Sequence, residues 1–230
     1  MSSPAPLWLP GSRTQVIACA AVMEEIRPHL PPGTECHALD FGLHADPSAL
    51  RRVLQETIDR AASSAETIIL GYGLCSMAVV GLRANGCTLV VPRVDDCIAI
   101  CLGSQEAYKA QFKCEPGTYY LTRGWIDVGD SPFSEHARLV EAFGAERAQR
   151  VMARLLRNYK RLAFIDTGQG GTEEYRQYSR NMASRFGLRY AEIPGSERLI
   201  RKMVSGPLDR EFVVARPGET ITYMDFKRAK

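Results

Sequence analysis

The chain has 230 residues, of which 45% are hydrophobic and 24% charged, and its formal net charge is +3. That length suits one large domain or two small ones, and the composition is typical of a globular protein. The charge is too small to indicate a nucleic-acid partner, and no apolar stretch approaches the roughly 20 residues that span a membrane. The N-terminus lacks a basic start followed by an apolar core, so we expect a flexible lead-in over residues 1–13 and a cytoplasmic location.

Strand-like and helix-like segments alternate through the first half of the chain. Apolar runs predict four buried strands, at residues 15–20, 35–41, 67–72 and 87–92. Apolar residues at helical spacing predict a helix over residues 46–64, and a short helix is expected over residues 76–86. Such alternation is typical of a parallel sheet with helices on both faces.

The second half is less regular but contains further strands and helices. The expected elements are an extended segment at 117–125, helices at 145–159, 173–187 and 196–206, strands at 161–168 and 188–194, and a terminal hairpin at 211–226. The hairpin would add an antiparallel edge. We therefore predict a single α/β domain over residues 14–230, with one mainly parallel, Rossmann-like sheet drawn from both halves and helices on both faces.

Three of the seven cysteines fall where a predicted strand gives way to a turn or helix: Cys19, Cys75 and Cys97. The carboxyl ends of parallel strands meet at one edge of a sheet, where ligands bind in such folds, so these thiols are expected to converge. Cys36 and Cys87 instead open their apolar runs and should lie at the opposite edge.

Converging thiolates can hold zinc with an open coordination position, or an iron–sulfur cluster with one open iron. The chain has no CxxC pair, which argues against a zinc ribbon. The alternative is that each cysteine is simply a small buried residue. His44, beyond the second strand, would be a fourth ligand or an acid–base group, although a loop histidine can also face solvent.

Glycines and charged residues surround the predicted thiol site. Gly71 and Gly73 would let a ligand approach the backbone, or they would serve only the geometry of a turn. GYGLCS lacks the third glycine of a dinucleotide fingerprint.

Two carboxylates and two guanidinium groups complete the candidate site residues. Asp95 and Asp96 directly precede Cys97 and would ligate a metal or orient a base, while the simpler interpretation is a helix cap. Arg93 and Arg123 would contact an anionic substrate or cofactor, although the aromatic residues around Arg123 more often belong to a core or an interface.

The motifs GYGLCS, PRVDDCIAICLGS, PGTYYLTRGW and IDTG together resemble the family known as domain of unknown function 1638. The likeness runs from about Thr14 to Ile221. The resemblance implies a role beside corrinoid-dependent one-carbon metabolism, with a corrinoid protein or methyltransferase as partner and a small molecule as substrate. The family brings no established catalytic residues, so the three cysteines are assigned by position alone.

Two classes of function follow from these features. One is a metal-dependent transferase that moves a methyl group to a soft nucleophile, with zinc or an iron–sulfur cluster as cofactor. The other is a non-enzymatic accessory protein that delivers or senses a metal or cofactor. Stoichiometric binding without turnover would distinguish the accessory protein from the enzyme.

Overall fold

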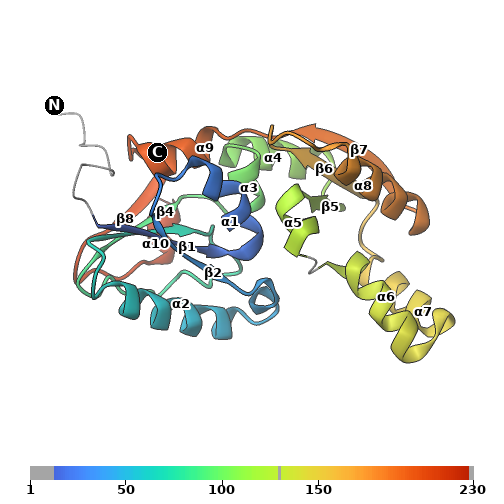
Figure 1. The fold of residues 1–230 in the computed structure, drawn as a ribbon, viewed down its shortest axis with the longest axis horizontal. Coiled ribbons are helices and arrows are strands. Elements are labelled where there is room, and N and C mark those ends of the chain that lie inside the picture. The colour runs from blue at the N-terminus through green and yellow to red at the C-terminus, as the bar shows by residue number, and fades with distance from the viewer. Residues whose placement is uncertain (1–12, 129–130, 228–230) are drawn as a thin grey trace.

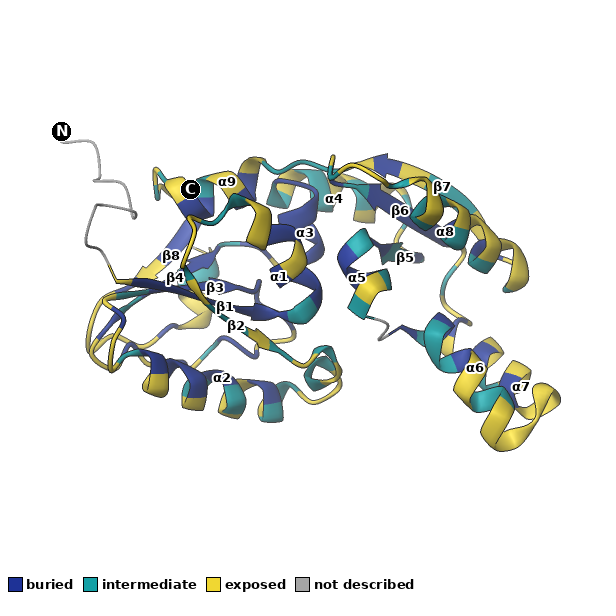
Figure 2. Cartoon of the chain, in the orientation of Figure 1, coloured by how far each residue is buried: buried dark blue, intermediate teal, exposed yellow. Residues whose placement is uncertain are grey.

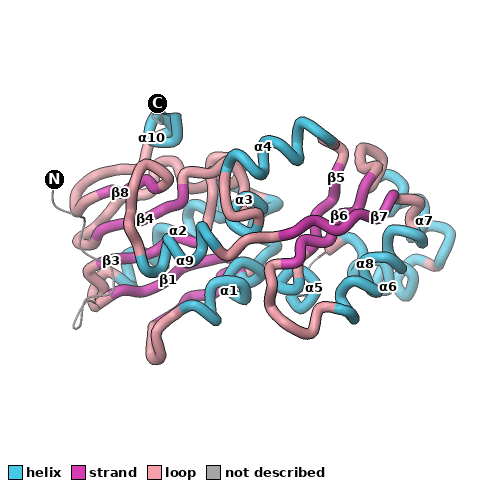
Figure 3. The backbone as a smooth tube through the Cα atoms, turned by 90° about the horizontal axis from the view of Figure 1, so that it is seen from above, coloured by secondary structure: helices cyan, strands magenta, loops and turns pink. Residues whose placement is uncertain are grey.

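The computed structural model describes residues 13–128 and 131–227, so the predicted lead-in lies outside the described residues except for Arg13. The strands form two sheets that lie side by side in the view from above (Figure 3). The α/β class, the mainly parallel strands and an antiparallel edge are confirmed. The prediction of one sheet drawn from both halves is wrong, because five strands form one sheet and three form another.

The larger sheet has the strand order β2-β1-β3-β4-β8. Its strands are β1 (Thr14–Cys19), β2 (Glu35–Leu39), β3 (Thr67–Gly71), β4 (Thr88–Pro92) and β8 (Phe212–Ala215). β1 pairs in parallel with β2 and β3, and β3 pairs in parallel with β4. β8 runs antiparallel to β4 and covers its open edge. That edge is therefore closed to the other three strands, which form a sheet of their own.

The predicted terminal hairpin does not form. After β8 the chain leaves the sheet, Thr220 makes an isolated bridge with Arg83, and helix α10 (Tyr223–Lys227) follows. Pairing with β4 buries Phe212 and Val213 in the core. An isolated two-stranded hairpin would bury much less apolar surface, so pairing with the large sheet is favoured.

Helices cover both faces of the larger sheet, as predicted (Figure 1). α2 (Pro47–Ala61) lies on one face, and α1 (Ala20–Ile26) and α9 (Arg198–Ser205) lie on the other. α2 begins where the Asp46 carboxylate accepts two backbone N–H groups of the first turn. Its buried residues, at helical spacing, are Leu50, Leu54, Thr57, Ile58 and Ala61. The short helices of this half are η1 (Arg27–His29), η2 (Phe41–Ala45) and α3 (Ile98–Cys101).

The smaller sheet is parallel and has the order β5-β6-β7. Its strands are β5 (Thr118–Leu121), β6 (Arg161–Asp166) and β7 (Arg189–Pro194). The helices of this part of the chain are α4 (Gln105–Cys114), α5 (Arg123–Val128), α6 (Pro132–Phe143), α7 (Ala145–Leu155) and α8 (Glu173–Arg185). α8 packs on β6 and β7, and the α6–α7 pair carries much exposed surface (Figure 2). Among the described residues, no helix is long and apolar enough to cross a membrane.

Two sequence-based boundaries in this half are wrong. The segment predicted as extended to residue 125 becomes helical at Arg123, because the Thr122 hydroxyl accepts the N–H of Trp125 at 3.4 Å and caps α5. The helix predicted over residues 145–159 ends at Leu155.

The two sheets are joined through α1 and α5, which pack closely on each other. A Cβ atom at Gly124 of α5 would lie 2.3 Å from the Ala21 carbonyl oxygen of α1, so only glycine allows this approach. The Glu25 carboxylate, 1% exposed, accepts hydrogen bonds from the Thr167 hydroxyl at 2.7 Å and the Gln169 amide at 2.8 Å. These contacts hold α5 and the loop after β6 against α1, which follows the carboxyl end of β1.

Candidate functional site

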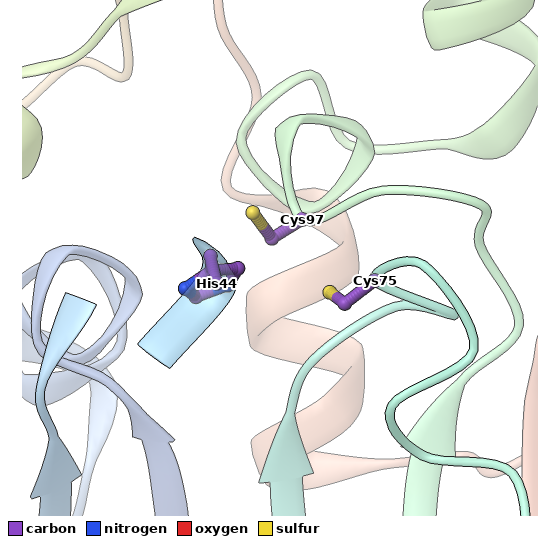
Figure 4. Close-up of side chains that lie close together, drawn as sticks. All are labelled: His44, Cys75 and Cys97. Carbon is purple, nitrogen blue, oxygen red and sulfur yellow. The ribbon is translucent and has the colours of Figure 1, made fainter. Parts of the chain in front are cut away.

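Four successive strand ends of the larger sheet carry the candidate side chains. Cys19 is the last residue of β1, His44 lies in η2 after β2, Cys75 follows β3, and Cys97 lies between β4 and α3. The ligand atoms of His44, Cys75 and Cys97 all lie within 4.8 Å of one another (Figure 4). Cys19 lies close enough to Cys97 and His44 for each of them to lower the pKa of its thiol. We call these four residues the thiol–imidazole cluster.

The loop after β3 is held against the loop after β4 by backbone hydrogen bonds. The Leu74 N–H donates to the Val94 carbonyl at 2.9 Å, and the Cys75 N–H donates to the Asp95 carbonyl at 3.3 Å. These bonds extend the pairing of the two strands beyond the sheet. They bring Cys75 next to Cys97.

Gly71 and Gly73 are required by the packing of these loops. A Cβ atom at Gly71 would lie 2.7 Å from the Ala18 Cβ, and one at Gly73 would lie 2.8 Å from the Val94 carbonyl oxygen. Both distances are shorter than real Cβ contacts. Both glycines are therefore needed for the close packing of these loops, which is the geometric role that the sequence suggested. Their role in ligand binding stays a prediction.

Cys75 begins a left-handed turn. The φ angles of Cys75, Ser76 and Met77 are 43°, 55° and 73°, in a region that costs a non-glycine residue on the order of 1 kcal/mol. The helix predicted over residues 76–86 is absent because this turn and Gly81, at φ 93°, interrupt it. Strained backbone of this kind is frequent at functional sites.

The imidazole of His44 is oriented by its backbone contact. Its Nδ1 lies 2.9 Å from the Phe41 carbonyl oxygen, which can only accept, so Nδ1 carries a proton. Its Nε2 is buried and has no hydrogen-bond partner of ordinary geometry among the described residues. Histidines that bind metals usually donate their other N–H in this way. The Tyr72 ring stacks on the imidazole with centroids 6.0 Å apart.

The cysteines and His44 control each other's ionisation. A hydrogen bond from Cys97, together with the effect of His44, outweighs burial and lowers the pKa of Cys75 to about 6. Burial lowers the pKa of His44, but the polar contact with Cys75 and the charge of Cys19 outweigh burial and raise it to about 9. Hydrogen bonds with Cys19 and Cys75 raise the pKa of Cys97 well above its usual value. Near neutral pH, a Cys75 thiolate therefore lies beside a His44 imidazolium.

The two predicted carboxylates lie in different environments. Asp96 accepts the Ile98 N–H at 2.9 Å, which caps α3, and also the Cys97 thiol at 3.5 Å. Asp95 accepts the Gln105 side-chain amide at 2.5 Å. Asp96 thus has the capping role and also contacts the cluster, whereas Asp95 bonds away from the thiols.

The guanidinium groups of Arg93 and Arg123 bond elsewhere. Arg93 donates to the Arg210 and Phe212 carbonyls at 2.8 and 2.9 Å and so anchors the chain around β8. Arg123 pairs with Asp127 at 3.3 Å on α5. The structure does not bring either group into the thiol–imidazole cluster.

Sequence reasoning missed Tyr72, although it lies in the GYGLC motif. Its side chain is fully buried, and its hydroxyl has no hydrogen-bond partner among the described residues. Burial and the charges of the neighbouring cysteines raise the pKa of Tyr72, so the phenol stays neutral. The sequence feature that could have identified Tyr72 is an aromatic residue between two glycines at the end of a predicted strand.

A cavity of about 320 Å³ adjoins the cluster. We call it the aromatic cavity, and its lining residues are Phe41, His44, Asp96, Cys97, Ile98, Tyr108, Phe112, Pro116, Thr118, Tyr119, Tyr120, Trp125 and Tyr159. The walls come from η2, α3, α4, β5 and α5. The cavity therefore lies between the two sheets, with an imidazole and a thiol of the cluster in its lining.

A family model described as protein of unknown function (DUF1638) matches residues 38–204, well over half of the chain. The chain belongs to the DUF1638 family. The DUF1638 match includes His44, Cys75 and Cys97, whereas Cys19 precedes it, and it is shorter than the likeness inferred from the motifs. A search of curated proteins and a search of solved structures gave no match.

The donor set of this DUF1638 protein suits a small thiophilic metal ion. Around zinc, with Zn–S bonds near 2.3 Å, ligand atoms lie roughly 4 Å apart, so atoms within 4.8 Å need only small side-chain rotations. Two cysteines and one histidine leave a fourth position that Cys19 or a substrate could take. Without a metal, the same groups form a thiolate–imidazolium pair.

Proposed function

We propose that this DUF1638 protein binds zinc or an iron–sulfur centre through His44, Cys75 and Cys97 and transfers a methyl group to a soft nucleophile. The observation that carries the proposal is that one ring nitrogen of His44 and the sulfurs of Cys75 and Cys97 lie within 4.8 Å of one another, while the buried Nε2 of His44 has no hydrogen-bond partner of ordinary geometry among the described residues. Burying an unsatisfied polar atom is costly, so a ligand that satisfies it is favoured.

A bound zinc ion would lower the pKa of a thiol substrate and keep it a thiolate near neutral pH. In the transfer, the sulfur–carbon bond forms as the bond between the methyl carbon and the donor breaks. The electron pair of that bond stays with the donor, and the thiol proton passes to solvent.

The protein's own residues would orient and shield the reacting groups. The Phe41 carbonyl holds the His44 ring, and Asp96 accepts the Ile98 N–H and so fixes the turn that carries Cys97. Cys75 and Cys97 are only 8% and 5% exposed, which keeps bulk water from the nucleophile.

The corrinoid link is part of the proposal and rests on the resemblance of the motifs to the DUF1638 family. A corrinoid protein or a methyltransferase would be the partner, and the setting would be the cytoplasm. The methyl donor would then reach the cluster from the aromatic cavity, which has His44 and Cys97 in its lining.

An accessory role in metal or cofactor delivery is the second candidate. The observation that favours it is the deep burial of the cluster, because a site closed to substrate suits storage or sensing. Such a protein would bind its metal stoichiometrically without turnover.

The decisive assay supplies methylcorrinoid protein and a panel of thiol acceptors to the metal-loaded protein and follows the corrinoid spectrum. We expect demethylation that depends on the acceptor and is lost in Cys97→Ser. The matched control is Cys36→Ser, whose thiol lies at the start of β2 on the opposite edge. Demethylation equally fast with Cys97→Ser would remove that thiolate from the mechanism. No reaction across the panel, despite stoichiometric metal, would favour the accessory role.

A further inference from the structure

A cavity of about 340 Å³ lies where the chain leaves the carboxyl end of β4, the edge of a parallel sheet at which ligands bind. Its walls come from the loop after β4, α4, α9, the chain before β8 and α10. Among the described residues, it shares none of its lining with the aromatic cavity. We call it the basic cavity, because its lining includes four cations: Arg93, Lys109, Arg210 and Lys227.

The guanidinium of Arg93 is the fixed cation of the basic cavity. Its Nε and Nη2 donate to the carbonyls of Arg210 and Phe212, which hold the group in place but carry no net charge to balance it. Its Nη1 is buried and has no hydrogen-bond partner among the described residues. The carboxylate whose charge acts on Arg93 is Asp225, which makes no ion pair with it and accepts the N–H and hydroxyl of Thr222 at 2.7 Å. Because a charge shielded from water is costly unless it is paired, an anion in the cavity would stabilise this guanidinium.

The other three cations of the basic cavity are available to a ligand. Lys109, Arg210 and Lys227 are exposed, and none of them makes an ion pair with a described residue. Lysine and arginine stay protonated throughout the neutral range. The positive charge of the cavity therefore does not depend on the ionisation of the thiol–imidazole cluster.

Three carboxylates in the lining reduce this positive charge but do not cancel it. Glu211 is already paired, because Arg198 donates to it at 2.9 Å and Lys202 at 2.5 Å, and neither of these cations lines the cavity. The remaining carboxylates are those of Asp95 and Glu106, which are both exposed to solvent. Four cations against two carboxylates leave a surplus of two positive charges.

We propose that the basic cavity binds the phosphate group of a phosphorylated small molecule. A phosphate dianion matches a surplus of two charges, whereas a single carboxylate would balance only one. Guanidinium and ammonium groups form short, charge-assisted hydrogen bonds with phosphate oxygens. The cavity is larger than a phosphate ion, and Leu199 and Phe226 in its lining offer apolar surface to the rest of the molecule. This site uses none of the residues of the proposed function.

The test titrates glycerol 3-phosphate and, separately, glycerol into the full chain by calorimetry, at fixed ionic strength in a buffer without phosphate. The two molecules share a carbon skeleton and differ in the phosphate group. We expect one glycerol 3-phosphate to bind per chain and glycerol to give no heat of binding. No binding of glycerol 3-phosphate at millimolar concentration, or equal affinity for the two molecules, would overturn the inference.

A double variant with a charge-matched control locates the site. Lys109→Gln combined with Arg210→Gln removes two exposed cations of the lining, so the protein should fold and bind glycerol 3-phosphate about tenfold more weakly. Lys113→Gln combined with Arg154→Gln removes the same charge from exposed positions outside the lining and should bind like the wild type. Equal affinity of the two double variants would contradict the assignment to this cavity.

Arg93→Lys tests the fixed guanidinium directly. The substitution keeps the charge but loses the planar group that two carbonyls hold, so we expect at least about tenfold weaker binding. Wild-type affinity in a folded Arg93→Lys protein would overturn the role of Arg93, and circular dichroism establishes that the variant is folded. If it does not fold, the double variant decides.

Metal content measured on the same samples separates this inference from the proposed function. Phosphate-dependent binding in a protein that takes no metal would uphold the basic cavity and count against the proposed function. A metal-loaded protein that does not bind glycerol 3-phosphate would do the reverse.

Discussion

At the scale of single residues, the pairing of Cys75 with His44 is the main chemical feature of this protein. The Cys97 hydrogen bond and His44 lower the pKa of Cys75 to about 6, while Cys75 and Cys19 raise that of His44 to about 9, so Cys75 and His44 each favour the charged form of the other. The ion pair therefore exists between about pH 6 and pH 9. Stability from the thiolate is lost as the pH falls through the lower value, and stability from the imidazolium is lost as the pH rises through the upper value.

The thiolate can be titrated in the metal-free protein by its ultraviolet absorbance. We expect an inflection near pH 6 that is missing from Cys75→Ser and moves to higher pH in His44→Gln, because the neutral amide no longer stabilises the thiolate. Cys36→Ser should keep the inflection, because burial raises the pKa of Cys36. An unchanged curve in His44→Gln would show that the two groups are not coupled.

The left-handed turn that begins at Cys75 has a strained backbone, and a glycine substitution in the turn should relieve that strain. Ser76 is exposed and has a φ of 55°, so Ser76→Gly is expected to raise the free energy of unfolding by about 0.5 kcal/mol. Ser63→Gly, at an exposed serine outside the left-handed region, should instead lower it by about 0.5–1 kcal/mol. Urea unfolding measures the free energy of unfolding of both variants. A destabilised Ser76→Gly variant would show that the backbone of this turn is not strained.

At the scale of secondary structure, local patterns predicted most strands and the edge of the sheet at which the cysteines meet. Cys19, Cys75 and Cys97 could be placed because strand ends are readable from apolar runs, and parallel strands end at one edge. The turn at Cys75 could not be predicted, because its left-handed backbone is imposed by hydrogen bonds to the loop after β4.

Long-range pairing explains the other differences from the sequence-based expectations. Arg93 was expected beside the thiols, but its guanidinium reaches the carbonyls around β8, a strand from the far end of the chain. The sequence predicts a core or interface position for the aromatic residues around Arg123, because Tyr and Trp usually lie there. Their place opposite the cluster depends on the second sheet, which local periodicity does not reveal.

At the scale of the whole molecule, the candidate site depends on the junction between the two sheets. Glu25 is the buried carboxylate of that junction and accepts from Thr167 and Gln169. Glu25→Ala leaves those donors unpaired, so we expect the free energy of unfolding to fall by about 2 kcal/mol. Glu24→Ala, at the exposed neighbouring position, is the control and should change it little. Equal stability of the two variants in urea would show that Glu25 does not hold the junction.

The thiol–imidazole cluster is proposed to bind a metal, and the metal content of the protein after anaerobic purification tests this most directly. Elemental analysis with an ultraviolet–visible spectrum should find about one zinc per colourless chain, or iron with sulfide in a brown protein. We expect the metal to be lost in Cys97→Ser and His44→Gln and kept in Cys36→Ser. A folded wild-type protein with no metal, or equal metal in all three variants, would contradict the claim.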